Sequence, residues 1–568
     1  MGKKWTVLSA ISFILAEGLF FRFLYNRWMS AISIQFICDR LNCSKEVFVL
    51  ISSAIITLGA SIFIANLIKW ILSEKKIHLI KEHTRKTDWR IVGFVLLVAV
   101  IGITLCSRTS PLYSFNDSFD SHIYFTIGRG ITEGKVLYRD LLDQKGPYIY
   151  FIHAIAALID SKNFTGVYLI QIVFFFATLM IAVKTIKLVN PKDKVIYFGI
   201  PVFAAVILSS FCYWYGNNAE EYCWPSLLFG IYVLFKNLQK NRMPTNRDYF
   251  LIGITSGFIL WIKFNFLAFY IGWIIVPAIM YIQRKEWKKL FIGLGFIILG
   301  VLVISLPVLL YFGFNHALID LWQSYFYNNL FVYKAVSITE YRYGMIQQVF
   351  YSLWEQGNLN RFLSILLILS FMWVWSETTT TFKWAFMLMF GILNLVVMGI
   401  GVTYLYYYSI FSVFALFSML YIYDIINYLY LNNLFKELIV VGSAFLLIIT
   451  QSRNISFIGK PESDYPQNQF AYTINKSKNP TLLNYNMLDG GFYTASGIIP
   501  DTKYFFRINM PIQEQFETQD RIINNGEVEY IVSREYYEFP LYTLVQEGDH
   551  DNGEGNVHYY LYRLNTSN

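Results

Sequence analysis

Chemically reactive side chains gather in one polar stretch of an otherwise apolar chain, at positions 107–147. The part NDSFDSHIYF brings Asp117, Asp120 and His122 close together in the sequence. A second part, LYRDLLDQKGP, adds two acids and two bases, which are Arg139, Asp140, Asp143 and Lys145. A positioned carboxylate can take a proton from a reacting group, and a nearby cation can stabilise negative charge that develops there. This stretch is therefore the first candidate for a reactive site.

The alternative is a solvated loop whose charges have no special role. Against it, the stretch also carries aromatic residues that can pack, and Phe119, Ile123 and Ile127 follow the spacing of an amphipathic helix. A helix that begins at or just after Asp117 would hold Asp120 in its first turn. Asp117 itself would then serve as the N-cap of that helix.

Composition shows what must position these residues. The chain has 568 residues, of which 55% are hydrophobic and 15% charged, and its mean hydropathy is +0.43. Repeated apolar stretches of this kind predict a multi-spanning membrane protein. The net charge of +8 lies largely in short loops between the apolar stretches, so it indicates topology rather than nucleic-acid binding. The five cysteines form no C-x-x-C pair, although Cys38 and Cys43 share one loop.

We predict about thirteen membrane spans. The N-terminal one is expected to be a retained span rather than a cleaved signal, because Glu17 and Arg22 interrupt it. The predicted spans lie near 6–26, 47–72, 90–106, 165–187, 195–214, 222–238, 248–264, 265–283, 290–313, 361–376, 382–402, 404–427 and 435–453.

The basic loops fix an orientation for these spans. SEKKIHLIKEHTRKTDWR, VKTIKLVNPKDK, KNLQKNRMPTNRD and QRKEWKK should all be cytoplasmic under the positive-inside rule. They can all be inside only if the short apolar run 148–159 does not cross, so we predict an interfacial helix there, on the outer surface. Outside would then lie 107–164, 215–221, 314–360 and the segment after 453.

A second group of charges falls at the outer ends of later spans. Glu220 and Glu221 occupy the short external loop YGNNAEEYCWP, where they could instead simply cap a helix. Lys263 lies where two spans turn back on each other, and a lysine at membrane depth either faces a polar cavity or reaches out to water. Aromatic residues in 314–360 and 403–409 could form an acceptor wall or an interfacial belt.

The C-terminal part changes character. Residues 455–568 are polar, with turn signals such as DGG and NNGE and the strand-like runs VEYIVS and HYYLYRL. They predict a small extracellular domain that is α/β or β-rich.

In this order, the motifs resemble those of the GT-C-fold glycosyltransferases that use polyprenyl-phosphate sugars, such as protein O-mannosyltransferases and aminoarabinose transferases. DSHIY matches an external Asp that is followed four positions later by an aromatic residue, here Asp120 and Tyr124, although Ser121 replaces the usual second acid. The run from EGK to Lys145-Gly146-Pro147 matches a lysine-containing motif before an external helix. The resemblance is clear over about 89–290 and is a matter of pattern beyond that.

The resemblance implies a fold in three parts. Residues 1–88 would form an N-terminal transmembrane hairpin and a basic loop, and 89–454 an all-α polytopic GT-C-like catalytic domain with the external loop 107–164. Residues 455–568 would form the extracellular domain, as a bacterial cell-envelope type of the family has.

The resemblance also implies a reaction, in which a sugar moves from a lipid phosphate to an acceptor outside the membrane. Asp120 would be the general base of an inverting displacement. Lys145, Arg139 and Lys263 would bind the donor phosphate. The supporting acids would be Asp117, Asp140, Asp143, Glu220 and Glu221, and the sugar or acceptor contacts Tyr124, His122, Tyr341 and Arg342.

The expected partners are an undecaprenyl-phosphate sugar, the membrane lipid and a cell-envelope glycan, such as a cell-wall polysaccharide or teichoic acid, with a protein acceptor left open. We expect no required cofactor or metal; the alternative is that Asp140 and Asp143 help to bind a divalent ion. Three other functions stay open: a glycan polymerase or ligase of another fold, a flippase or transporter, and a non-catalytic scaffold.

Overall fold

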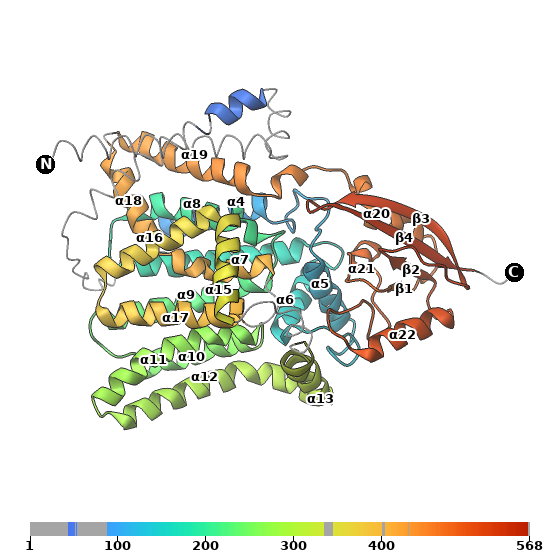
Figure 1. Ribbon diagram of the computed structural model, residues 1–568, viewed down its shortest axis with the longest axis horizontal. Coiled ribbons are helices and arrows are strands. Elements are labelled where there is room, and N and C mark those ends of the chain that lie inside the picture. The colour runs from blue at the N-terminus through green and yellow to red at the C-terminus, as the bar shows by residue number, and fades with distance from the viewer. Residues whose placement is uncertain are drawn as a thin grey trace.

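The computed structural model describes residues 44–51, 53, 88–333, 345–399, 404–429 and 431–565 (Figure 1). Several predictions concern residues outside these ranges. They are the span at 6–26, most of the span at 47–72, the basic loop up to position 87, the pair Cys38 and Cys43, and the contacts assigned to Tyr341 and Arg342.

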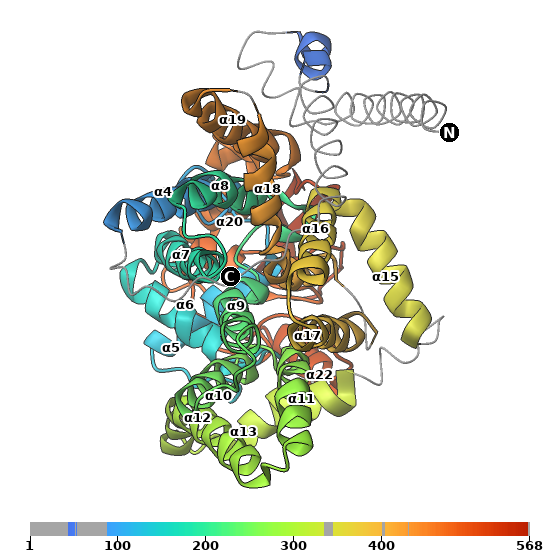
Figure 2. The same ribbon diagram turned by 90° about the vertical axis from the view of Figure 1, so that its left-hand side faces the viewer.

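Long apolar helices run roughly side by side and form a bundle (Figures 1 and 2). They are α4 (Trp89–Cys106), α7 (Thr165–Lys187), α8 (Asp193–Ser209), α9 (Ala219–Leu238), α10 (Asn246–Leu260), α11 (Ala268–Gln283), α12 (Trp287–Phe314), α16 (Arg361–Glu377), α17 (Thr380–Gly399) and α19 (Asn433–Gln451). Small residues allow close approach: a Cβ on Gly253 of α10 would lie 2.2 Å from the carbonyl oxygen of Ile297 in α12. This is how membrane helices commonly pack, since lipid provides little hydrophobic drive between them.

Shorter helices connect or continue this bundle. They are η1 (Phe211–Tyr213), η2 (Phe264–Leu267), α13 (Leu318–Leu321), the π-helical η3 (Trp322–Val332), α15 (Met345–Leu359), η4 (Leu405–Ala415) and α18 (Ser418–Tyr428). The axes of α15 and α16 differ by 115°, and those of η4 and α18 by 62°.

The number of spans can be compared with the prediction. Within the described ranges, six helices are long and apolar enough to cross a membrane, and up to eight spans result if each bent pair is one span. Every predicted span between 90 and 453 coincides with a helix or a bent pair, but α8, α9 and α10 do not meet the length and composition expected of a span. The helical class is confirmed, whereas the count of about thirteen is not.

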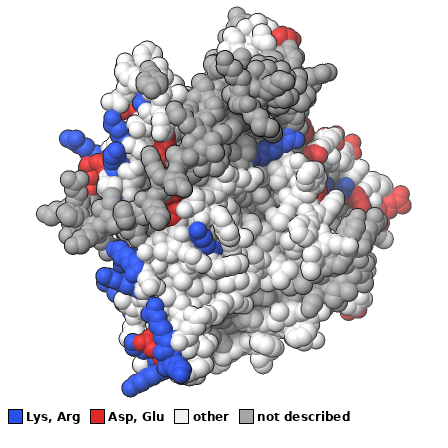
Figure 3. Space-filling view, turned by 60° about the vertical axis from the view of Figure 1, so that its left-hand side comes forward, with Lys and Arg blue, Asp and Glu red and all other residues white. Residues whose placement is uncertain are grey.

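The basic connections lie at one end of the bundle. The α7–α8, α9–α10 and α11–α12 connections are at the end away from the C-terminal sheet (Figure 1). Their exposed cations include Lys192, Arg242, Arg247 and Lys285. On the face drawn in Figure 3, Lys and Arg lie mainly along the left edge, beside a broad surface that is nearly free of charge. These connections therefore carry the positive charge from which the topology was predicted.

Two helices of the segment 107–164 lie between the bundle and the C-terminal sheet (Figure 1). They are α5 (Phe119–Thr132) and α6 (Pro147–Ile159), and both were predicted as helices. The predicted N-cap is wrong by one residue: Ser118, not Asp117, caps α5, and its hydroxyl accepts a hydrogen bond from the backbone N–H of Ser121 at 3.2 Å. Serine is a good cap for the same reason as aspartate, because its side-chain oxygen satisfies a free helix N–H.

The C-terminal segment contains a small mixed sheet. Its elements are η5 (Ile455–Phe457), η6 (Glu462–Asp464), α20 (Pro466–Ile474), β1 (Leu482–Asn484), α21 (Phe492–Ser496), α22 (Gln513–Asn524), β2 (Tyr530–Ser533), β3 (Tyr542–Asp551) and β4 (Asn556–Leu564). The four strands have the order β1-β2-β4-β3, with β1 parallel to β2 and the other pairs antiparallel. The two predicted strand runs form β2 and β4, so the expected α/β character is confirmed.

This sheet segment packs against α5. The guanidinium of Arg129 donates to the carbonyl oxygen of Tyr493 at 3.0 Å, and the hydroxyl of Thr126 donates to Asp489 Oδ2 at 2.9 Å. Buried apolar residues of α20, α21, β2 and β4 join the same core as the bundle. A boundary at position 454 stays a prediction, and the contacts across it are extensive.

Candidate active site

Asp120 lies in the first turn of α5 with its side chain 25% exposed. Tyr124, one helical turn later, is buried, and its hydroxyl donates to Asp120 Oδ2 at 3.1 Å. Residues four apart on a helix are neighbours, which gives the Asp-to-aromatic spacing a physical meaning. Burial, and then the charge of Asp120, raise the pKa of Tyr124 well above its ordinary value, so its hydroxyl stays protonated and can donate.

Lys145 lies beside Asp120, with its Nζ 3.6 Å from Asp120 Oδ2 and its side chain only 10% exposed. Gly146 makes this placement possible. Its N–H donates to the carbonyl oxygen of Ile262 at 3.0 Å, and a Cβ there would lie 2.2 Å from the carbonyl oxygen of Trp261. The glycine thus lets the backbone before α6 lie directly against the turn that carries Lys263.

The charge of Lys145 is held by the acids around it. Burial lowers its pKa, but the carboxylates, Asp120 first among them, outweigh that effect and raise the pKa above its ordinary value. Asp143 is one of these acids: its Oδ2 accepts from the Tyr150 hydroxyl at 2.6 Å, and that hydroxyl accepts from the Lys145 backbone N–H at 3.2 Å. Burial raises the pKa of Asp143, and Lys145 partly offsets this. Lys145 is therefore a fixed cation.

A second cation–acid pair lies at the ends of the spans. Lys263 Nζ is 2.7 Å from Glu220 Oε1, and the two side chains are 11% and 0% exposed. Glu220 lies in the first turn of α9, and its Oε2 has no hydrogen-bond partner among the described residues. The ammonium of Lys263 also lies 3.4 Å from the ring centre of Tyr407, a cation–π contact. Lys263 therefore faces a polar site and does not reach out to bulk water.

Tyr406 links the two pairs. It lies in η4, next to the ring that contacts Lys263, and its hydroxyl donates to Asp120 Oδ2 at 3.3 Å. The site thus combines α5, the segment before α6, the turn after α10, the start of α9 and the start of η4. Its principal members are Asp120, Lys145, Lys263, Glu220, Tyr124, Tyr406 and Tyr407.

Glu221 has a different role from Glu220. Its Oε1 accepts from the backbone N–H of Asn218 at 2.8 Å, and its Oε2 accepts from Gln171 Nε2 at 2.9 Å. It forms the capping box of α9, which was the alternative interpretation of this acid pair. Glu221 therefore stabilises a helix end and makes no contact with Asp120.

Arg139 and Asp140 pair with each other at 3.0 Å, in a partly exposed position. Arg139 Nη1 also donates to the carbonyl oxygen of Asn315, just after α12, at 3.0 Å. Neither side chain contacts Asp120 or Lys145 in the part of the chain that the structure describes. The geometry favours a role in holding the loop between α5 and α6 to α12, away from the principal site.

His122 faces the C-terminal segment. Its Nδ1 is 2.9 Å from the hydroxyl of Thr494, and its Nε2 is 2.6 Å from the carbonyl oxygen of Asn116. Burial lowers its pKa, so the neutral form is favoured. These contacts fill both ring nitrogens and place His122 in the packing between α5 and α21.

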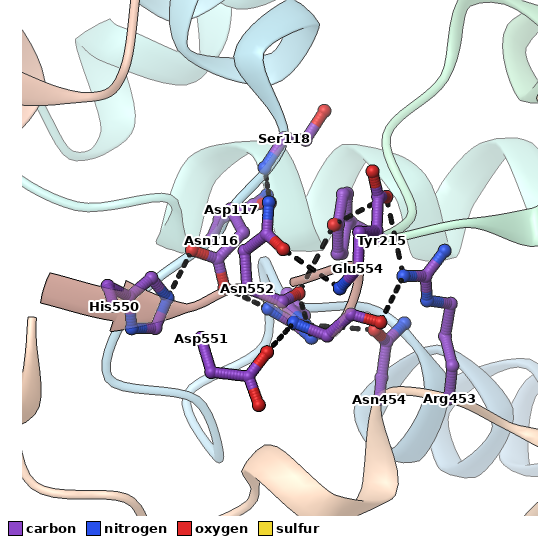
Figure 4. Close-up of polar contacts among 12 residues, drawn as sticks. Asn116, Asp117, Ser118, Tyr215, Arg453, Asn454, His550, Asp551, Asn552 and Glu554 are labelled. Carbon is purple, nitrogen blue, oxygen red and sulfur yellow. Dashed lines mark hydrogen bonds and ion pairs between the residues drawn. The ribbon is translucent and has the colours of Figure 1, made fainter. Parts of the chain in front are cut away.

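Asp117 belongs to a separate buried network (Figure 4). It forms a short ion pair with Arg108 Nη1, and its Oδ1 is 2.7 Å from His550 Nε2 of β3. Arg108 Nε donates to Asn454 Oδ1 at 2.9 Å, and its guanidinium stacks 3.6 Å from the ring centre of Phe457. This network fastens the start of the reactive stretch to the C-terminal sheet.

Sequence reasoning did not single out Arg108, His550 or Asn454. One signal was present, because an arginine directly after an apolar span needs a partner. Asp117, nine positions later, is the ion-pair partner of Arg108. His550, which binds the other oxygen of Asp117, lies hundreds of positions later in a strand that was not predicted, so nothing local could identify it.

No cluster of three or more His, Cys, Asp or Glu side chains suited to a metal occurs in the described ranges. Metal independence stays a prediction. Asp140 and Asp143, the alternative pair of ligands, bind different partners, Arg139 for the first and Tyr150 for the second.

Comparison with known proteins finds likeness in structure but not in sequence. No family model matches the chain, and no curated protein matches it. The structure of the aminoarabinose transferase ArnT from Cupriavidus metallidurans in the apo state is similar, with a TM-score of 0.54 and 12% identity over 84% of this chain and 97% of that chain. A structure of that ArnT bound to undecaprenyl phosphate has a TM-score of 0.48 and 11% identity, over 83% and 97% of the two chains. The apo likeness shows a common fold, so the GT-C-like fold is confirmed.

Proposed function

We propose that this protein is an integral-membrane glycosyltransferase, which moves a sugar from a polyprenyl-phosphate donor to a cell-envelope acceptor with Asp120 as the general base. One observation carries the proposal: a partly exposed carboxylate lies 3.6 Å from a buried cation, Lys145, at the end of an apolar bundle. Lys263 provides a second cation at the same site. The fold shared with ArnT supports the same class of reaction.

The site suits a direct displacement. The acceptor hydroxyl attacks the anomeric carbon while the bond from that carbon to the lipid-phosphate oxygen breaks. The electron pair of the broken bond stays on the phosphate, and the hydroxyl proton passes to Asp120. A hydroxyl is a weak nucleophile, so this proton transfer lowers the barrier. A single displacement inverts the anomeric centre.

Lys145 and Lys263 would stabilise the negative charge that develops on the phosphate. A preorganised cation stabilises the transition state more than the ground state, because the leaving phosphate gains charge as the bond breaks. Lys145 is ready for this because it is charged and held in place. Lys263 lies closer to its acid, 2.7 Å from Glu220 against 3.6 Å between Lys145 and Asp120, so it would share more of its charge with that acid. We therefore assign Lys145 the larger part.

The surroundings suit a lipid donor. Leu302, Leu306 and Leu310 are exposed along α12, which gives the bundle an apolar outer surface. The prenyl chain can stay in such surroundings while its phosphate reaches the site at the end of the bundle. We propose undecaprenyl phosphate as the carrier, with a cell-wall polysaccharide or teichoic acid as the acceptor.

We further propose that the basic end of the bundle is cytoplasmic and that Asp120 and residues 455–568 are extracellular. Single cysteines in place of Arg242 and Asp501, both exposed positions, test this with an impermeant thiol reagent on whole cells. The cysteine at 501 should react and that at 242 should not. The reverse pattern would contradict the topology.

Glycan analysis of a deletion strain tests the function itself. The strain should lack one sugar on an envelope glycan and should accumulate the corresponding undecaprenyl-phosphate sugar. Wild-type protein should restore the glycan, and purified protein should transfer the sugar to membranes from the deletion strain. If purified protein in vesicles moves the lipid-linked sugar between leaflets without cleaving it, the protein is a flippase and the enzyme proposal is wrong.

A further inference from the structure

A tyrosine far along the chain contacts the proposed base. The hydroxyl of Tyr406, in η4, donates to Asp120 Oδ2 at 3.3 Å across 286 positions of sequence. Tyr124 donates to the same oxygen at 3.1 Å, and Lys145 Nζ lies 3.6 Å from it. Three groups from three different segments therefore converge on one oxygen of the carboxylate.

The other oxygen, Oδ1, is left open by the residues that the structure describes. Within the described ranges, no group donates a hydrogen bond to Asp120 Oδ1. The Asp120 side chain is also 25% exposed. A carboxylate with one oxygen held by several donors has its side-chain torsions fixed, because rotation would break all of these contacts together. The free oxygen then points in one direction, as a base must point at the proton that it removes.

We propose that Tyr406 is a positioning residue, which together with Tyr124 fixes Oδ2 of Asp120 so that Oδ1 is the atom that accepts the proton of the acceptor hydroxyl. This inference rests on the proposed function, because it assumes that Asp120 is a base. It adds the identity of the reacting atom and a residue that lies outside the motif of the external loop.

The assignment matches the division of charge at the site. Oδ2 faces Lys145, the cation assigned to the donor phosphate, whereas Oδ1 accepts the proton. The two oxygens of the carboxylate therefore have different roles. In the reaction the O–H bond of the acceptor breaks, Oδ1 gains the proton, and Oδ2 keeps its two hydrogen bonds. No donor has to move during the step, which is what preorganisation requires.

Tyr404 provides a matched control. Its ring stacks on that of Tyr406, with centres 5.7 Å apart and planes 14° apart, and its hydroxyl lies 3.4 Å from that of Tyr333. Its hydroxyl makes no contact with Asp120 within the described ranges. Replacement of either tyrosine by phenylalanine keeps the stacked rings and removes one hydroxyl, so the two variants differ in the contact with the base.

The test uses full-length protein in lipid nanodiscs, with undecaprenyl-phosphate hexoses as donors and deletion-strain membranes as acceptors. Tyr406→Phe should lower kcat about tenfold, the effect expected for one lost hydrogen bond to a charged group, with the donor KM within about twofold of wild type. Tyr404→Phe should leave both constants within about twofold. Binding of undecaprenyl phosphate alone and the melting temperature should be the same in all three proteins.

Each outcome decides between the possibilities. A kcat for Tyr406→Phe equal to that of Tyr404→Phe would overturn the positioning role. So would a loss that is accompanied by an equal loss of undecaprenyl-phosphate affinity or by a lower melting temperature, because the hydroxyl would then be structural. If Asp120→Asn is inactive while Tyr406→Phe is fully active, only this inference fails. If Asp120→Asn is fully active, the proposed function fails with it.

Discussion

The ammonium of Lys145 lies 3.6 Å from Oδ2 of Asp120, although Lys145 precedes α6 and Asp120 lies in the first turn of α5. The pair forms because the segment before α6 lies against the turn after α10. The same approach places the segment that carries Lys145 against the turn that carries Lys263. In the proposed function this arrangement combines a base with two phosphate-binding groups, and it leads to the following predictions.

Removal of the Lys145 charge should weaken donor binding. Lys145→Ala should lower the affinity for undecaprenyl phosphate by roughly 10–100-fold, the range for a lost hydrogen bond to a charged group. Lys145→Arg should recover part of this, since the charge remains while the shape of the group differs. Titration of intrinsic tryptophan fluorescence with undecaprenyl phosphate measures both. Equal affinity in Lys145→Ala and wild type would contradict the assignment of the phosphate site.

A methyl group at Gly146 should push the segment that carries Lys145 away from the turn that carries Lys263. Its Cβ would lie 2.2 Å from the carbonyl oxygen of Trp261, so the backbone must shift and carry Lys145 with it. Gly146→Ala should therefore lower transfer at least about tenfold, because positioning errors of an ångström are costly. Gly93→Ala in α4 is the control, since a Cβ there meets nothing within 4 Å. Transfer rates at matched protein amounts compare them, and equal rates would show that the contact is not needed.

Neutralisation of Asp117 should destabilise the fold and leave the chemistry intact. Arg108 and Asp117 have side chains 0% and 3% exposed, so Asp117→Asn leaves a buried guanidinium without its counter-charge. Loss of one partner of such a pair costs about 3–5 kcal/mol. The melting temperature should fall clearly, while kcat per folded molecule changes little.

The exposed pair of Lys135 and Asp501 provides the control for that experiment. Its N–O distance is 2.9 Å, but Asp501 is 75% exposed, and exposed pairs contribute little to stability. Asp501→Asn should have the same melting temperature as wild type. If Asp117→Asn and Asp501→Asn both have the melting temperature of wild type, the buried network does not stabilise the C-terminal segment as its contacts indicate.

His153 should make the fold sensitive to acid. Its side chain is buried in α6, where Nδ1 lies 2.7 Å from the carbonyl oxygen of Ile149, and burial lowers its pKa to about 4. In the unfolded chain this histidine has the ordinary pKa of about 6.5. Above that pH the histidine is neutral in both states and does not lower the free energy of unfolding. As the pH falls towards about 4, the unfolded chain binds a proton that the folded chain does not, and the free energy of unfolding decreases. The loss is on the order of 3 kcal/mol.

Melting curves at pH 7.5 and pH 5 test this sign. Wild type should lose more stability between the two pH values than His153→Gln, which cannot take up a proton. A larger loss in the variant would show that another group governs the acid sensitivity.

Local patterns in the sequence were enough for one half of the site. Asp120 and Tyr124 are one turn apart on a helix, and such a spacing can be predicted without knowledge of the fold. Lys145 precedes a proline that begins a helix, which is also a local signal. The apolar runs predicted the bundle for the same reason.

The other half depends on contacts between distant segments. Tyr406 reaches Asp120 across 286 positions, and no spacing rule connects them. Glu220 and Glu221 are adjacent and chemically alike, but their side chains leave α9 in different directions. As a result Glu220 forms an ion pair with Lys263, whereas Glu221 caps the helix. β3 was not predicted because it is polar and lies at the edge of the sheet, so most of its side chains are exposed and the alternating apolar pattern is weak.

Sugar transfer by Asp120→Asn tests the central claim most directly. The substitution keeps the size of the side chain and removes its capacity to accept a proton. With purified protein in lipid nanodiscs, undecaprenyl-phosphate hexose donors and deletion-strain membranes, turnover should fall roughly 10²–10⁴-fold. Undecaprenyl-phosphate binding and the melting temperature should stay close to wild type, and Asp501→Asn should transfer normally. Full turnover by Asp120→Asn would contradict the assignment of Asp120 as the base.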